Sequence, residues 1–421
     1  MKQILIILSG ILAVLLLVAA GALVYIDRTG IPHYAPGKIQ LEVDVTPERV
    51  ARGRRTVQLL CAGCHLDNDT ASLAGKPMPD LPAQFGSAHS ANITRDPETG
   101  IGSWTDGEIA YMLRTGIRRD GRYAPPWMVK VPKMADEDVL DVIAFLRSDD
   151  PLVRPIKAKR PLSQPSLLTK ALSRVVFKPL PYPEAPIVAP DPADKVAHGR
   201  YLVQGRALCY GCHSADFAKL DDVVPERSAG YLGGGNAMPD MNGRIVTTAN
   251  ITPDMETGIG KWSEDEFVRL LRFGVRPDNT VIVYPMVPYP ELSDDEARAI
   301  HAYLRTVPPI KNAVPRIAAT VTPAGADAGR AAYYRYGCNG CHGDTGVGLY
   351  DLRKGATDFA TDAELIAYIR HPEVLKPGVK MPTWDGVIAE ADYAPLAAYA
   401  RNLGKAPRAE PSAQSRNALE L

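Results

Sequence analysis

The chain has 421 residues, and its 48 lysine and arginine residues balance its 48 aspartate and glutamate residues, so its formal net charge is zero. This balance argues against a nucleic-acid-binding protein, which usually carries a basic excess on one face. A hydrophobic share of 46% excludes a wholly disordered chain. At roughly 150 residues per domain, the length predicts two or three domains.

The chain begins with an uncharged apolar run from Ile4 to Ile26, which is closed by Asp27 and Arg28. A membrane-spanning helix needs about 20 apolar residues, whereas the core of a signal peptide needs about 7–15. The length therefore favours a retained membrane anchor. The alternative is a cleavable signal peptide, because Ala20-Gly21-Ala22 has the small-x-small form of a cleavage site. In either case we expect residues 27–421 to be exported.

All six cysteines belong to three C-x-x-C-H motifs, which span Cys61–His65, Cys209–His213 and Cys338–His342. This is the attachment motif of c-type haem. Residues i and i+3 share one face of a helix, so both thiols can form thioethers with one porphyrin, and the histidine that follows can bind the iron. We therefore predict three covalently bound haem c groups. Their attachment residues are Cys61, Cys64, Cys209, Cys212, Cys338 and Cys341, and their iron ligands on this side are His65, His213 and His342.

Two other uses of such a motif are a zinc site and a redox-active dithiol. Zinc needs two more cysteine or histidine ligands at each site. The other histidines, at positions 33, 89, 198, 301 and 371, are too scattered to supply them. A redox dithiol would call for a strand–helix context, which the sequence does not suggest. Haem attachment is therefore the favoured interpretation.

The first two motifs belong to visibly related repeats. Residues 91–104 read Ala-Asn-Ile-Thr-Arg-Asp-Pro-Glu-Thr-Gly-Ile-Gly-Ser-Trp, and residues 249–262 read Ala-Asn-Ile-Thr-Pro-Asp-Met-Glu-Thr-Gly-Ile-Gly-Lys-Trp. The third repeat is shorter and more diverged.

Each repeat predicts the same three helices. The first runs into the motif and starts at a capping residue followed by proline, at Thr46-Pro47, Asp191-Pro192 and Thr322-Pro323. The second opens with a capping box, at Thr105–Glu108, Ser263–Glu266 and Thr361–Glu364. The last opens with acidic residues, at Asp136–Asp138, Ser293–Glu296, and Glu390 with Asp392. No stretch alternates convincingly with period two, so the predicted class is mostly α.

The repeats and the proline-rich stretches between them predict seven segments. They are a signal-anchor or signal peptide at 1–27, haem domains at 47–150, 191–308 and 323–407, a Pro-rich basic linker at 151–190, a second linker at 309–322 and a tail at 408–421.

An electron-transfer haem needs a sixth iron ligand, and a methionine thioether raises the potential. Each repeat has a methionine in a proline-containing loop before its last helix, namely Met128, Met286 and Met381. Met128 and Met286 hold equivalent positions in the two related repeats. The alternative for any methionine is core packing.

Other residues compete for this role or for contact with the haem. Met134 lies near Met128, Met78 and Met238 occur in matching Met-Pro-Asp segments that suggest loop packing, and His89 is matched by Thr247 in the second repeat. Trp104, Trp262 and Trp384 are candidate haem-packing aromatics, although an ordinary core position is as reasonable for each.

Residues 151–183 contain seven lysine or arginine residues and no aspartate or glutamate. Within them, residues 166–177 can form a short amphipathic helix. One interpretation is a patch that binds a membrane surface or a partner. The favoured one is a helix packed across the haem domains with its charges in solvent.

With these motifs, the chain resembles the three-haem cytochrome c subunits of bacterial membrane-bound alcohol, gluconate and aldehyde dehydrogenases. The likeness is best over residues 47–310, including His198–Val203 and the Pro285–Pro290 loop. It implies three tandem class I cytochrome c domains in the periplasm, with Met128, Met286 and Met381 as the distal ligands. Such subunits take electrons from a separate catalytic subunit and pass them to quinone or the respiratory chain. The altered loop around Met128 and the generic third repeat depart from this pattern.

Two hypotheses follow. The first is a non-catalytic cytochrome attached to the periplasmic side of the inner membrane, with a dehydrogenase as electron donor and quinone, a terminal oxidase or a soluble cytochrome as acceptor. The second is a haem enzyme, peroxidase-like or a sulfur-compound oxidase, with one open or labile iron site. The first haem, with its altered loop and nearby His89, is the best candidate for that site. Three candidate methionines favour the first hypothesis.

Overall fold

The computed structural model describes residues 2–67, 70–78, 81–158, 161, 163–239, 245–278, 280, 282, 285–315, 327–343, 345–346, 352, 356, 358–376 and 381–405. The chain is mostly helical, at 46%, and the predicted class is thus confirmed. Two small antiparallel sheets are present in the described part: β1 (Gly86–Ser87) pairs with β2 (Gln164–Pro165), and β3 (Ala237–Pro239) pairs with β4 (Ile245–Thr247). The predicted tail, 408–421, lies outside the described residues.

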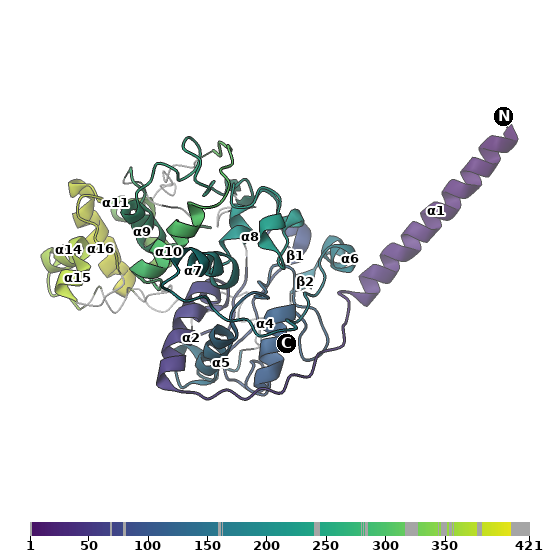
Figure 1. Ribbon diagram of the computed structural model, residues 1–421, viewed down its shortest axis with the longest axis horizontal. Coiled ribbons are helices and arrows are strands. Elements are labelled where there is room, and N and C mark those ends of the chain that lie inside the picture. Colours follow the sequence, from purple (N-terminus) through teal and green to yellow (C-terminus); the bar gives the residue numbers. More distant parts are fainter. Residues whose placement is uncertain are drawn as a thin grey trace.

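Helix α1 (Lys2–Thr29) projects away from the rest of the molecule (Figure 1). Within Gln3–Thr29, an 18-residue window has a mean hydropathy of 2.9, and none of that window is buried. At 1.5 Å per residue, α1 is about 42 Å long, more than the roughly 30 Å of a bilayer's hydrocarbon core. By length and composition, α1 can cross a membrane.

Most of the remaining helices surround three hydrophobic clusters, here called the first, second and third cores. The first core is built from α2 (Pro47–Leu60), α3 (Ala62–His65), α4 (Asp106–Thr115) and α5 (Asp136–Arg147). The second is built from α7 (Lys195–Tyr201), the π-helical turn η3 (Leu202–Arg206), α8 (Cys209–His213), α9 (Glu264–Phe273) and α10 (Asp294–Leu304). The third is built from α11 (Ala328–Arg335), α12 (Cys338–His342), α14 (Asp362–Arg370) and α16 (Glu390–Lys405), and the short helix α15 (Pro372–Leu375) follows α14.

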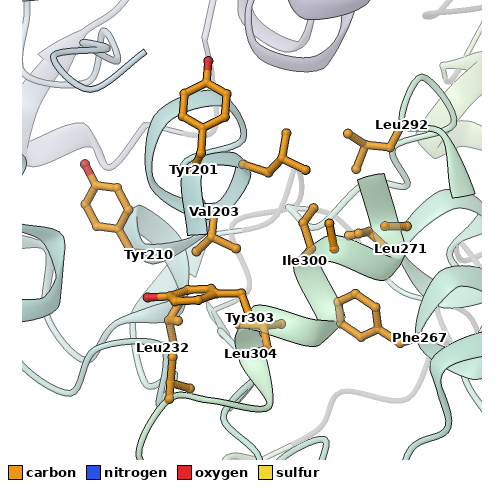
Figure 2. Close-up of a cluster of buried hydrophobic side chains, with 14 of the residues drawn as sticks. Tyr201, Val203, Tyr210, Leu232, Phe267, Leu271, Leu292, Ile300, Tyr303 and Leu304 are labelled. Atoms are coloured by element: carbon orange, nitrogen blue, oxygen red, sulfur yellow. The ribbon is translucent and has the colours of Figure 1, made fainter. Parts of the chain in front are cut away.

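Short elements connect these helices. They are the 3-10 turns η1 (Ala83–Phe85), η2 (Pro151–Val153), η4 (Phe217–Lys219) and η5 (Pro225–Arg227), and helix α6 (Leu167–Val175) in the basic linker. Figure 2 shows the second core, in which Leu271, Ile300 and Leu304 of α9 and α10 gather with Leu232 and Val203.

One helix crossing recurs in all three cores. The helix that leads into each motif crosses the last helix at a glycine. A Cβ atom on Gly53 of α2 would lie 1.8 Å from the Asp141 carbonyl oxygen of α5, and one on Gly199 of α7 would lie 1.9 Å from the Ala299 oxygen of α10. In the third core, a Cβ on Gly329 would lie 2.2 Å from the Pro395 oxygen. The diverged third repeat therefore keeps the same close approach of two helix backbones.

The predicted capping boxes are confirmed. Thr105, Ser263 and Thr361 each accept a hydrogen bond from the backbone of the glutamate three residues later, whose side chain bonds back to the cap. The last helices also start where the acidic residues predict, at Asp136, Asp294 and Glu390.

The predicted start of the first helix is confirmed only in the first repeat, where the Thr46 side chain caps α2 and Pro47 follows. In the second repeat the prediction is wrong, because α7 begins at Lys195. The Asp194 carboxylate accepts from Ala197 N–H at 3.0 Å, while Asp191 accepts from Ala193 N–H in a separate turn. Thr322 and Pro323 lie outside the described residues, and α11 begins at Ala328 after the capping Asp327.

The first and second cores are joined by a partly buried ion cluster centred on Glu296 of α10. Arg55 of α2 donates to one Glu296 oxygen at 2.5 Å, and Arg206 of η3 donates to the other at 2.7 Å. Apolar contact accompanies the charges, because Leu59 packs against the second core and Leu208 packs against both.

The ion cluster predicts an acid-sensitive stability. Burial by itself raises the pKa of Glu296, but Arg206, the Ser293 N–H and Arg55 outweigh it and hold this pKa below 4.5. A carboxyl whose folded pKa is lowered stabilises the fold above its unfolded pKa and loses that contribution as the pH falls through the folded value. We expect Glu296→Gln to cost about 3 kcal/mol at neutral pH, since Arg206 stays buried without its charge partner. As the pH falls below about 4.5, the Glu296→Gln variant should also lose less of its remaining stability than the wild-type protein does.

Urea unfolding followed at a series of pH values checks this expectation. The matched control is Glu256→Gln, because Glu256 pairs with Lys311 at 67% and 72% side-chain exposure, and such a surface pair contributes at most about 1 kcal/mol. A Glu296→Gln variant with the stability and acid profile of the control would contradict the role of the Glu296 ion cluster.

Candidate haem-attachment sites

Each C-x-x-C-H motif forms a short helical turn at the end of a longer helix. In the first motif, the N–H groups of Cys64 and His65 both donate to the Cys61 carbonyl, at 3.1 and 2.8 Å. The second and third motifs form α8 and α12. All six thiols are free of disulfides. The two thiols of a motif therefore lie one turn apart on one helix face, as attachment to a single porphyrin edge requires.

The environment of the thiols argues against a redox dithiol. Burial, with a smaller effect from the partner thiol, raises the pKa of Cys61, Cys209 and Cys338 to about 12. Reactive dithiols depend on a lowered pKa, because the thiolate is the nucleophile. Among the residues that the structure describes, no three His, Cys, Asp or Glu side chains come together as a metal site. The zinc alternative therefore has no support in the described part.

The histidines of the first two motifs are held by backbone carbonyls. His65 Nδ1 lies 2.8 Å from the Ala91 oxygen, and His213 Nδ1 lies 2.7 Å from the Ala249 oxygen. Burial lowers the pKa of both imidazoles, which favours the neutral form. A neutral imidazole that donates from Nδ1 keeps a lone pair on Nε2 for a metal. Both rings therefore keep Nε2 available to a metal, and these residues fit a covalently attached haem. His342 ends α12.

These carbonyls explain why the Asn-Ile-Thr segments are repeated. The Asn92 side chain accepts from the Thr94 N–H and hydroxyl and donates to the Ile156 carbonyl at 2.8 Å. Asn250 makes the equivalent bonds with Thr252 and the Ile310 carbonyl. Each asparagine thus fixes the backbone that presents its neighbour's carbonyl to the histidine. The repeated Ala-Asn-Ile-Thr segment is visible in the sequence, but nothing in the sequence identifies the motif histidine as the group that its alanine carbonyl contacts.

The candidate methionines differ in what the structure places beside them. Met286 packs against the second core together with Cys209, and Met381 packs against the third core together with Cys338. The Met286 loop also contains Tyr289, which lies near the thiols of the second motif. Burial, together with the Cys209 and Cys212 thiols, raises the pKa of Tyr289. Met128 is half-buried in a turn, where its N–H donates to the Pro125 carbonyl, and it does not pack with the first core.

Met134, the nearby rival of Met128, is a core residue. It is 1% exposed and lies within the first core. Its counterpart at the repeat offset is Leu292, which is also 1% exposed and lies within the second core. An apolar side chain without a ligating atom fills the same place in the second repeat, so packing accounts for Met134.

The other rivals are held in backbone pairings. Met78 N–H donates to the Ala88 carbonyl, and Met238 pairs with Val246 between β3 and β4. His89 is tied to the linker, since its N–H donates to the Ser163 hydroxyl at 3.0 Å. The candidate tryptophans each pack in the core of their own repeat, namely Trp104 in the first, Trp262 in the second and Trp384 in the third.

Two arginines that sequence reasoning missed brace the methionine loops. The Arg114 guanidinium, 2% exposed, donates to the carbonyls of Val131, Pro132 and Met134 and to Asp136. At the repeat offset, Arg272 bonds Asp294 and the Pro290 carbonyl. Both arginines connect the loop to the first turn of the last helix. The available signal was an identical arginine in the aligned segments.

A lysine further braces the first loop. Lys130 Nζ donates to the Pro125 carbonyl at 3.0 Å and lies 4.6 Å from the centre of the Tyr123 ring. Burial lowers the pKa of Lys130 to about 7, against a smaller opposing effect of Asp222. Asp222 accepts from Tyr210 of the second motif, so the first methionine loop faces the second repeat.

Comparison with known proteins agrees with these features. A family model described as cytochrome c oxidase, cbb3-type, subunit III matches residues 324–399. The chain is 29% identical over 330 residues to the cytochrome c subunit of the quinone alcohol dehydrogenase of Gluconobacter oxydans, covering 73% of this chain and 66% of that one. It is 29% identical over 266 residues to the gluconate 2-dehydrogenase cytochrome c subunit of Pantoea cypripedii, covering 59% and 56%.

A shorter relative is matched over most of its length. The chain is 30% identical over 260 residues to a protein of Cereibacter sphaeroides named diheme cytochrome c-type, covering 60% of this chain and 83% of that one. In contrast, the matches span between about half and two thirds of the dehydrogenase subunits.

Proposed function

We propose that this chain, which belongs to the family of c-type cytochromes that includes the cytochrome c subunits of membrane dehydrogenases, is a three-haem electron-transfer protein. The observation that carries the haem count is the recurrence of one arrangement. In each repeat, a helix ends at a C-x-x-C-H turn and crosses the last helix at a glycine. The shorter relative is named a diheme cytochrome. Whether this chain carries two or three haems therefore depends on the third repeat.

We assign a role to each candidate residue. Cys61, Cys64, Cys209, Cys212, Cys338 and Cys341 form the thioethers, His65, His213 and His342 bind the iron on one side, and Met128, Met286 and Met381 bind it on the other. A haem held in this way exchanges one electron at its iron, and methionine ligation raises its potential. The carbonyls of Ala91 and Ala249 keep two imidazoles oriented toward the metal.

The contacts between the cores suggest the order of the relay. Leu59, close to Cys61, packs against the second core, and Leu208, next to Cys209, packs against both. On the other side, burial and Glu291 of the second repeat raise the pKa of Cys341 to about 12. The second repeat thus packs against the first and has Glu291 near the third motif, and we infer that electrons pass through its haem between the first and the third.

We further propose a periplasmic protein that α1 attaches to the membrane. The donor is the catalytic subunit of a membrane dehydrogenase, and the acceptor is quinone, a terminal oxidase or a soluble cytochrome. Retention of α1 is supported by its 28 residues, which exceed the roughly 7–15 apolar residues of a signal-peptide core. The C-terminal end of α1 contacts the folded part. Lys170 Nζ donates to Asp27 Oδ1 at 2.7 Å, and Arg174 donates to Thr29 Oγ1 at 2.5 Å and to the Gly30 carbonyl at 3.0 Å.

Carbon monoxide binding to the fully reduced, purified protein tests the proposal. Visible absorption would be followed against a haem count for the same sample. We expect three haems per chain and no spectral change, because every iron has two protein ligands. One responding haem would instead indicate an open or labile iron and support the haem-enzyme alternative. A count of two would overturn the assignment of the third repeat.

A further inference from the structure

We propose that α6 is a second membrane contact, which lies in the bilayer surface beside the emerging end of α1. This inference goes beyond anchoring by α1 and depends on the proposed retention of α1. Its starting observation is a contact between two segments far apart in sequence, since Figure 1 shows α6 next to the end of α1 that joins the folded part.

Helix α6 buries its small polar side chains and exposes apolar ones. Its small polar face is directed at the protein: Thr169 and Ser173 are fully buried, and the Thr169 hydroxyl donates to the Phe85 carbonyl at 2.8 Å. Its apolar face is directed outward, with Leu168 45% and Val175 73% exposed. These two residues lie at i and i+7, on one side of the helix. Helices on globular proteins normally show the opposite arrangement, in which the apolar face is buried.

The exposed apolar face extends beyond these two side chains. Leu167 and Val176 at the two ends of the helix are 38% and 45% exposed. A group of neighbouring exposed apolar residues on an otherwise ordinary surface marks a site of contact with another phase or molecule. The sequence had favoured a helix packed across the haem domains, whereas α6 packs on the η1 loop of the first repeat and on the end of α1.

The third face fixes the depth of α6 relative to α1. Lys170 and Arg174, at i and i+4, hold Asp27, Thr29 and Gly30, and the Arg174 guanidinium lies 5.4 Å from the centre of the Tyr25 ring. A tyrosine at the end of an apolar helix is typical of the membrane–water interface. The contacts of Arg174 therefore place α6 at headgroup level, with Leu168 and Val175 next to the hydrocarbon region.

Charge supports a lipid surface as the occupant. Residues 151–183 hold seven basic residues and no acidic one. Basic residues next to a membrane helix are attracted to anionic lipid headgroups. A short amphipathic helix with this composition binds a bilayer in the interfacial plane. The first repeat would thus rest against the membrane, and the third core would lie at the opposite end of the molecule from α1 (Figure 1).

Photolabelling of the full-length, haem-loaded protein tests this proposal. The protein is reconstituted in vesicles of phosphatidylethanolamine and phosphatidylglycerol that contain a phospholipid with a photoreactive group high in its acyl chain. Labelled peptides are then mapped by mass spectrometry. We expect label in α1 and in residues 167–176, but none around Val188, an 82% exposed apolar residue of the same linker.

Two variants complete the experiment. A double variant, Leu168→Glu and Val175→Glu, should lose the α6 label and keep the α1 label, whereas Val188→Glu should keep both. Label confined to α1 in the wild-type protein, or unchanged in the double variant, would overturn the second contact while leaving the anchor in place. Label in neither segment would overturn the anchor itself, and the proposal with it.

Discussion

Replacing Gly199 by alanine is expected to destabilise the second repeat by about 3 kcal/mol or more. The new Cβ would lie 1.9 Å from the Ala299 carbonyl oxygen and 3.0 Å from the Tyr303 Cβ, and the first of these is backbone that no rotamer change can move. Helices α7 and α10 would have to separate, which opens the second core beside Tyr201 and Leu304. Urea unfolding followed by far-ultraviolet circular dichroism measures the loss.

The matched control is Gly211→Ala, in the turn between Cys209 and Cys212. A Cβ at Gly211 meets nothing within 4 Å, and a helical glycine-to-alanine change in open space gains up to about 1 kcal/mol. Haem content gives a second reading, since a repeat whose helices cannot close should also attach less haem. If Gly199→Ala were as stable as the control, the close crossing, and with it the recurrence behind the haem count, would be wrong.

The parts of the fold that the sequence predicts best depend on local chemistry. A capping box at Thr105 or Ser263 needs only a glutamate three residues later, so both partners are visible in the sequence. The start of α7 is harder, because Asp191 and Asp194 are both good caps. The structure uses Asp194 for the helix and Asp191 for the turn before it, and nothing within four residues distinguishes them.

The spacing between the crossing glycine and the first cysteine of the motif differs between the first two repeats. Gly199 precedes Cys209 by more residues than Gly53 precedes Cys61. The extra residues are absorbed by the wider π-helical turn η3 and by Leu208, whose φ is +52°. Because the crossing glycine and the first cysteine are both fixed in space, the segment between them has to change its winding.

The candidate site was predictable in its ligand types but not in its supporting contacts. The motif identifies His65 directly, whereas the Ala91 carbonyl that orients its ring belongs to a loop far along the chain. A backbone acceptor has no residue-type signature, so only the folded chain reveals it. The burial of Thr169 in α6 is similar, because a polar side chain facing the protein contradicts the usual amphipathic pattern.

Substitution of Met128 is expected to open the first haem. In the reduced Met128→Leu protein, one of three haems should bind carbon monoxide, and its midpoint potential should fall, because the thioether that favours the reduced iron is gone. The fold should persist, since Met128 is half-buried and does not pack with the first core. Visible spectra with and without the gas, together with a redox titration, measure both effects.

Met134→Leu is the control that separates ligation from packing. Leu292 already fills the equivalent place in the second core, and a leucine-for-methionine exchange in a core usually costs less than about 1.5 kcal/mol. This variant should therefore keep three gas-insensitive haems and unchanged potentials. The reverse pattern, with gas binding in Met134→Leu and none in Met128→Leu, would transfer the ligand role to Met134. Carbon monoxide binding at the first haem of the unmodified protein would mean that this loop supplies no permanent iron ligand. Met128 would then be at most an exchangeable ligand of that haem.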